Sequence, residues 1–220
     1  MCLIAVAAKP EVLSPQVLAD ALSANPHGFG FMAVREGHLA SERFGQMTSP
    51  KQYNRDFLEK LDEWRNAADG QVVVHLRQRT HGLADDSMAH PFPLDTGKVR
   101  GLLMHNGIFQ SGFLHSLYEG VLKHRPDAGA FPEEARIGSL SDTAIYVKLL
   151  EMARLDAEEL STVFGQSVRL APMNRLVFWD EDKDAPDIYN MESGVTSPDG
   201  ALWYSNDWYF HGPVSDVWAA

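Results

Sequence analysis

Apolar and polar positions along the chain predict strands near both ends and helices between them. The segment from Cys2 to Ala8 is one apolar run, which predicts a strand buried on both faces. Further β-branched, aromatic or alternating runs predict strands at 29–34, 38–44, 71–76, 100–105, 174–179, 187–191 and 201–205. The sequence Ser-Pro-Asp-Gly at 197–200 is typical of a turn and separates the last two of these strands.

Apolar residues at helical spacing predict the helices. Ser14 and Pro15 are typical of the cap and the first position of a helix. Further helices are expected at 112–123 and 142–152, and a capping box at 156–159 predicts a shorter one. In the segment 50–64 one helical face consists of Tyr53, Phe57, Leu61 and Trp64. Strands followed by helices and then by strands predict layered α and β structure with mostly antiparallel pairing.

Length and composition narrow the class of protein. A chain of 220 residues is long enough for one buried core and short for two, so we expect a single domain over 1–220. The net charge of −11 argues against a nucleic-acid partner. No segment is apolar enough for a membrane span or a signal peptide, and one cysteine forms no intramolecular disulfide. We therefore expect a soluble, cytoplasmic protein.

The chain's one cysteine, Cys2, directly follows Met1. Removal of Met1, which is efficient before a small residue, leaves a thiol and a free α-amine on the same residue. An α-amine has an ordinary pKa of about 7.7–8.0, so it accepts the thiol proton near neutral pH. Cys2 is thus a candidate nucleophile that carries its own base. The simpler alternative is that Cys2 is a small buried apolar residue.

Four short motifs accompany Cys2 along the chain. They are His75-Leu-Arg-Gln-Arg-Thr-His-Gly82, Ala89-His-Pro-Phe92, Met104-His-Asn-Gly-Ile108 and Leu140-Ser-Asp-Thr143. In this order behind a Met-Cys start, they resemble the glutaminase domain of class II glutamine amidotransferases, which are N-terminal nucleophile (Ntn) hydrolases. The similarity extends to about residue 150 and is greatest to small, stand-alone members. It implies an α+β fold, a four-layer αββα sandwich of two antiparallel sheets.

The resemblance also implies catalytic roles. Cys2 attacks the side-chain amide of L-glutamine, releases ammonia and forms a γ-glutamyl thioester, while its α-amine transfers the proton. The Asn106 side chain and the Gly107 N–H form the oxyanion hole, where a donor is worth about 3–4 kcal/mol. Without the resemblance, Asn106-Gly107 is equally typical of a hairpin turn.

The resemblance also implies which residues bind the two charged groups of the substrate's amino-acid head, the α-carboxylate and the α-ammonium group. Arg77 binds the substrate α-carboxylate, because a planar guanidinium matches two carboxylate oxygens. Asp142, expected at a helix start, binds the α-ammonium group. Taken singly, Arg77 is also typical of a surface cation and Asp142 of a helix cap. The resemblance further implies that the pocket is lined by Thr80, His81 and Gly82.

No metal or cofactor is expected. The nine histidines include no His-x-x-x-His pair on a helix, and one cysteine cannot complete a thiolate cage. The chemistry of the family needs no imidazole, so His75, His90 and His105 are expected to be structural. For His90 there is an alternative, because it lies in a long loop, about 78–98, that is a candidate lid.

The function expected first is a glutamine-hydrolysing amidotransferase subunit that delivers ammonia to a separate synthase. The alternative is a γ-glutamyl amide hydrolase with the same Cys2 chemistry and no ammonia transfer. Gln78 favours it, because many family members have an aromatic residue there, and a more polar wall with a long loop leaves room for a bulkier amine. A third hypothesis, an inactive interaction module, is disfavoured by the complete set of candidate residues.

Overall fold

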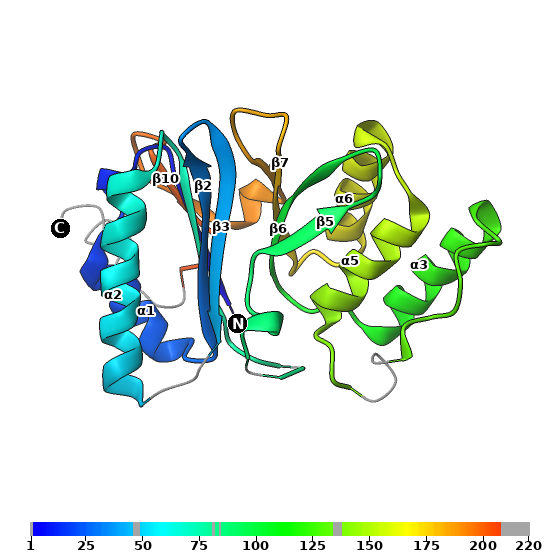
Figure 1. Ribbon diagram of the computed structural model, residues 1–220, viewed down its shortest axis with the longest axis horizontal. Coiled ribbons are helices and arrows are strands. Elements are labelled where there is room, and N and C mark those ends of the chain that lie inside the picture. Colours follow the sequence, from blue (N-terminus) through cyan, green and yellow to red (C-terminus); the bar gives the residue numbers. More distant parts are fainter. Residues whose placement is uncertain (1, 46–48, 81, 84, 134–137, 208–220) are drawn as a thin grey trace. The chain divides into compact units, whose positions relative to one another are not determined.

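The protein is built on two antiparallel sheets, each within its own unit of the chain. The computed structural model describes residues 2–45, 49–80, 82–83, 85–133 and 138–207. Within these bounds, a first unit contains 2–78, 85–91 and 191–207, and a second unit contains 79–83 and 92–190. Figure 1 shows the strands and helices of both units, labelled where there is room. Across the described ranges, no helix combines the length and apolar character needed to cross a membrane.

The first unit contains a six-stranded sheet in the order β3-β2-β4-β1-β10-β9, with antiparallel pairing throughout. Its strands are β1 (Leu3–Ala7), β2 (Gly28–Arg35), β3 (His38–Gly45), β4 (Val72–Leu76), β9 (Val195–Thr196) and β10 (Leu202–Tyr204). Its helices are α1 (Pro15–Ala24) and α2 (Pro50–Ala67), with short 3₁₀ turns η1 (Pro10–Val12), η2 (Asp86–Met88) and η3 (Met191–Ser193).

The second unit contains a four-stranded antiparallel sheet in the order β5-β6-β7-β8. Its strands are β5 (Phe92–Asp95), β6 (Arg100–Asn106), β7 (Arg175–Asp180) and β8 (Asp187–Tyr189). Its helices are α3 (Ser111–His124), α5 (Asp142–Ala153) and α6 (Ala157–Leu170). The predicted α+β class with two antiparallel sheets is therefore confirmed.

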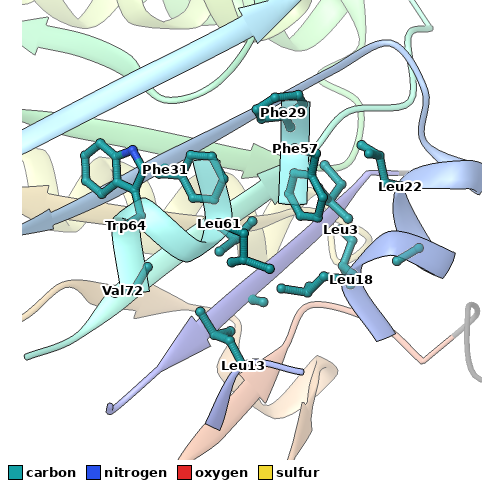
Figure 2. Packing of buried hydrophobic residues seen from close by; sticks show 14 of the residues in the cluster. Leu3, Leu13, Leu18, Leu22, Phe29, Phe31, Phe57, Leu61, Trp64 and Val72 are labelled. Carbon is teal, nitrogen blue, oxygen red and sulfur yellow. The ribbon is translucent and has the colours of Figure 1, made fainter. Parts of the chain in front are cut away.

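The core of the first unit lies between its sheet and the helices α1 and α2 (Figure 1). Figure 2 shows aromatic side chains of β2 and α2 packed together, among them Phe31, Phe57 and Trp64. The rings of Phe31 and Trp64 stack with their centres 5.6 Å apart. As expected from the helical spacing, the four residues predicted for one face of α2 are all buried: Tyr53, Phe57, Leu61 and Trp64.

Side chains alternate between the two faces of this sheet, which decides which strand residues are available for chemistry. Leu3 and Ala5 of β1 belong to the core beneath α1 and α2. Ile4 therefore faces the opposite side, and its partner in the β1–β4 register is His75. Cys2 lies directly before the first residue of β1, next to this opposite face of the sheet.

The helix starts follow the predicted capping chemistry. Ser14 accepts a hydrogen bond from the Val17 N–H at 3.4 Å, and Pro15 occupies the first helical position of α1. At α6 the capping box is complete: Asp156 accepts from the Glu159 N–H at 3.0 Å, and Glu159 accepts from the Asp156 N–H at 2.9 Å.

Three predicted elements differ from the structure. The expected loop at about 78–98 contains the strand β5, in which buried and exposed residues alternate and Pro93 occupies an exposed position. Pro93 is tolerated because β5 is an edge strand, where a missing N–H breaks no ladder bond. The helix expected to be short, α6, has 14 residues. The turn at 197–200 connects β9 to β10, whereas β8 belongs to the other sheet.

Candidate active site

Cys2 lies directly before β1 and is held by backbone and side-chain groups of the first unit. The Gln78 N–H donates a hydrogen bond to the Cys2 sulfur at 3.4 Å, and the thiol donates to the Gln78 carbonyl at 3.6 Å. An N–H that donates to sulfur favours the thiolate over the thiol. Cys2 as a whole is half-buried.

Residues after β10 fix the position of the chain's first residues. The Asn206 side-chain amide donates to the Cys2 carbonyl at 2.8 Å. The Ser205 hydroxyl accepts from the Ile4 N–H at 2.8 Å, and the Ser205 N–H donates to the Ile4 carbonyl at 2.8 Å. The roles of Ser205 and Asn206 were not predicted from the sequence. The feature that could have indicated them is a pair of polar residues directly after an apolar strand.

Arg77 follows β4 and is buried, with 3% of its surface exposed. Its N–H donates to the Gly28 carbonyl at 2.7 Å, and its carbonyl accepts from the His27 N–H at 3.0 Å. Burial raises the pKa of nearby Tyr53, and the positive charge of Arg77 opposes that increase. The alternative of Arg77 as a surface cation is therefore wrong, while its binding of a carboxylate stays a prediction.

His75 and His90 form a buried stack in the first unit, with ring centres 4.0 Å apart. The His90 carbonyl occupies the space that a Cβ on Gly30 would need, so Gly30 allows this close approach of the two backbones. These contacts agree with the structural role predicted for both histidines.

In the second unit, Asn106 ends β6 and Gly107 begins the connection to α3. Asn106 is fully buried, and Gly107 has φ +145°, a conformation that favours glycine. Because β6 continues into a helix rather than a paired strand, the hairpin alternative for Asn106-Gly107 is wrong. Among the residues that the structure describes, the Gly107 N–H meets no acceptor, so it is available to a ligand.

The two N–H groups after Gly107 are bound within the second unit. The Ile108 N–H donates to Asn174 Oδ1 at 2.7 Å. The Phe109 N–H donates to Asp142 Oδ2 at 2.6 Å. These two bonds determine the course of the loop after Gly107. We call the segment 106–109 the oxyanion loop, after the oxyanion hole that the resemblance predicts there.

Asp142 is the first residue of α5, and the helix cap is the preceding residue, Ser141. The Ser141 hydroxyl accepts from the Ala144 N–H at 3.2 Å, so the alternative of Asp142 as the capping residue is wrong. A carboxylate at a helix start is stabilised by the helix dipole. Asp142 thus joins α5 to the oxyanion loop through one oxygen, while its binding of the α-ammonium group stays a prediction.

His105, the residue of β6 before Asn106, contacts both α5, through Thr143, and Asn174. Its Nε2 lies 3.2 Å from Asn174 Oδ1, and its Nδ1 lies 2.8 Å from the Thr143 hydroxyl. Because a carbonyl oxygen only accepts, the proton is on Nε2, and Thr143 donates to Nδ1. Burial lowers the pKa of His105, against the opposing effect of Asp142, so the neutral ring is favoured.

The remaining pocket candidates are on the segment 79–83 of the second unit. Thr80 is exposed. Gly82 has φ +75°, and a Cβ there would lie 2.7 Å from the Ser141 N, so Gly82 packs against the start of α5. His81 lies outside the described residues. The structure thus brings Gly82, Asp142 and the oxyanion loop together in the second unit, and Cys2, Gln78 and Arg77 occur in the first.

No metal centre accompanies these residues in the described part of the chain, where no three His, Cys, Asp or Glu side chains are arranged to hold an ion.

Comparison with known proteins supports the fold. Among solved structures, the chain is similar to glutamine phosphoribosylpyrophosphate (PRPP) amidotransferase from B. subtilis, complexed with ADP and GMP, with a TM-score of 0.55 and 13% identity. The similarity covers 93% of this chain and 42% of that chain, so this chain spans less than half of the neighbour's length. At this identity the likeness shows the fold, which is the class expected for an Ntn hydrolase.

No protein-family model matches the chain. No curated protein matches it either.

Proposed function

We propose that the chain is an N-terminal nucleophile amidase that hydrolyses glutamine and supplies ammonia to a separate synthase. The observation that carries the proposal is the environment of Cys2, whose sulfur accepts the Gln78 N–H and whose carbonyl is held by Asn206. A cysteine at this place, held at both its sulfur and its backbone, is arranged for nucleophilic attack. The shared fold with a solved amidotransferase supports the same conclusion.

The proposed reaction begins once Met1 has been removed. The free α-amine of Cys2 takes the thiol proton, and the thiolate attacks the side-chain amide carbonyl of glutamine. The developing oxyanion receives hydrogen bonds from the Asn106 side chain and the Gly107 N–H. The C–N bond then breaks, and the protonated α-amine returns the proton to the leaving ammonia, which leaves a γ-glutamyl thioester.

Water completes the cycle. The α-amine accepts a proton from water as the water oxygen attacks the thioester, and the Cys2 thiol leaves with glutamate as the second product. Overall, glutamine and water give glutamate and ammonia. Arg77 binds the α-carboxylate and Asp142 the α-ammonium group, with Thr80, His81 and Gly82 lining the pocket. Ammonia is mostly protonated at neutral pH, so a synthase partner would need to take it directly from this protein.

A second candidate function is hydrolysis of γ-glutamyl amides of larger amines. Ile108, next to Gly107, is 43% exposed, and an apolar amine would cover a surface that ammonia leaves unused. The polar side chain of Gln78 beside Cys2 is the second feature in its favour. A higher kcat/KM for a secondary γ-glutamyl amide than for glutamine would establish this candidate over the first.

The proposal is tested with the mature protein and its Cys2→Ala variant. Intact mass is expected to show loss of Met1, and a chloroketone analogue of glutamine is expected to add once, at the chain's one thiol. Cys2→Ala is expected to lose more than about 10³-fold in kcat while its melting temperature stays near that of the wild type. Wild-type turnover by a protein that keeps Met1, or by Cys2→Ala, contradicts the proposal.

A further inference from the structure

We propose that Asn174, the residue before β7, is the positioning residue of the oxyanion loop, whose side-chain oxygen holds the Gly107 N–H in place for the reacting carbonyl. This inference rests on the proposed function and adds a residue from outside the four motifs. It is argued from contacts within the second unit alone.

The backbone of Asn174 is fixed from two sides. Its N–H donates to the Ala171 carbonyl at 2.8 Å, and its carbonyl accepts from the Asn190 side-chain amide at 2.9 Å. The same Asn190 amide donates to the Pro172 carbonyl at 2.8 Å. Asn174 itself is fully buried. These bonds hold the Asn174 backbone in place, and a backbone that is held limits where the buried side chain can lie, which is what a positioning group needs.

The side-chain oxygen of Asn174 accepts two hydrogen bonds, from the Ile108 N–H at 2.7 Å and from His105 Nε2 at 3.2 Å. Both donors are an N–H, so the oxygen rather than the amide nitrogen of Asn174 must face them. One oxygen thus joins the end of β6 to the loop that follows it. The bond on the far side of His105, from Thr143, extends the connection to α5.

Gly107 lies between these two donors and touches Asn174 directly. A Cβ added to Gly107 would overlap Asn174 Oδ1 and lie 2.8 Å from its Cα. Asn174 therefore supports the peptide after Gly107 from one side, by contact and by the Ile108 bond. The Gly107 N–H belongs to the preceding peptide, so its direction depends on the same support.

The experiment compares Asn174→Leu, which keeps the branched shape of the side chain and removes the acceptor, with Asn174→Asp, which keeps an acceptor oxygen. Asn174→Leu is expected to lower kcat about 10- to 100-fold, because a donor displaced by a fraction of an ångström loses transition-state contact. KM for glutamine is expected to stay within about two-fold, since the loop does not bind the head group. Asn174→Asp is expected to recover most of the lost kcat.

Thr96→Val is the matched control. It removes a buried hydroxyl of the same unit, which donates to the Leu155 carbonyl at 2.7 Å in the turn between β5 and β6. We expect this control to lower the melting temperature and leave kcat unchanged. If Asn174→Leu keeps the wild-type kcat, if Asn174→Asp is as slow as Asn174→Leu, or if Thr96→Val loses as much kcat, the inference is wrong.

Amide hydrogen exchange separates this inference from the proposed function. The Ile108 amide is expected to exchange at least about 10-fold faster in Asn174→Leu than in the wild type, because its acceptor is lost. If the wild type hydrolyses no γ-glutamyl amide, the proposed function fails, and unchanged exchange at Ile108 overturns the positioning role by itself. Should Asn174→Leu not fold, Asn174→Ser replaces it in both measurements.

Discussion

At the scale of single residues, Gly30 and Gly107 each leave room for a neighbouring residue where a side chain would otherwise lie. Gly30 leaves room for the His90 carbonyl, and Gly107 leaves room for Asn174. Gly107 also has a positive φ, so an alanine there would be strained even in open space. The motif around Gly107 was recognisable in sequence, whereas Asn174 was not, because a single Asn at a strand start carries no distinctive spacing.

Gly107→Ala is expected to lower kcat at least about 100-fold, because the oxyanion loop must move away from Asn174. The matched control is Gly120→Ala, in the middle of α3, where an added Cβ meets nothing within 4 Å. Alanine there is expected to stabilise the protein by about 0.5–1 kcal/mol, with unchanged kcat. Steady-state kinetics and thermal unfolding of both variants check this, and wild-type kcat in Gly107→Ala would contradict the assigned role.

At the scale of elements, local sequence chemistry predicted helix starts well and strand partners poorly. Ser14-Pro15 and the box at 156–159 act within one turn, so the residues themselves specify the cap. The strand β5 was missed because Pro93 is tolerated at a sheet edge, and edge position depends on the rest of the sheet. The assignment of β8 and β10 to different sheets likewise depends on distant partners.

Asp156→Ala is expected to destabilise the protein by about 0.5–2 kcal/mol, because it removes the acceptor of the Glu159 N–H at the start of α6. Glu158→Ala, an exposed change in the same turn that leaves the capping box intact, serves as the control and is expected to cost less. Denaturant unfolding measures both. If the free energy of unfolding falls equally in the two variants, the hydrogen bonds of the capping box contribute nothing beyond the charge of the carboxylate.

At the scale of the whole molecule, burial of a neutral His105 links folding to pH. Burial lowers the pKa of His105 below its ordinary value of about 6.5, so the unfolded chain binds a proton more readily than the folded one. Its contribution to stability is complete above about pH 6.5 and decreases as the pH falls from there towards the lower folded pKa.

The free energy of unfolding is therefore expected to decrease between pH 7 and pH 5, and His105→Gln is expected to reduce this dependence. His38→Gln, at an exposed position, is the control and should leave the slope as in the wild type. Urea unfolding at several pH values gives the slopes. A His105→Gln slope equal to that of the wild type would show that other groups account for the pH dependence.

The hydrogen bond from Asn206 to the Cys2 carbonyl spans 204 positions of the sequence. During translation, a nascent chain that has not yet reached Asn206 lacks this bond and the Ser205 contacts beside it. The hydrogen bonds around Cys2 are consequently complete only after residues 205 and 206 have been synthesised. Under the proposed function, ribosome-bound intermediates would therefore carry a nucleophile that is not yet fully positioned.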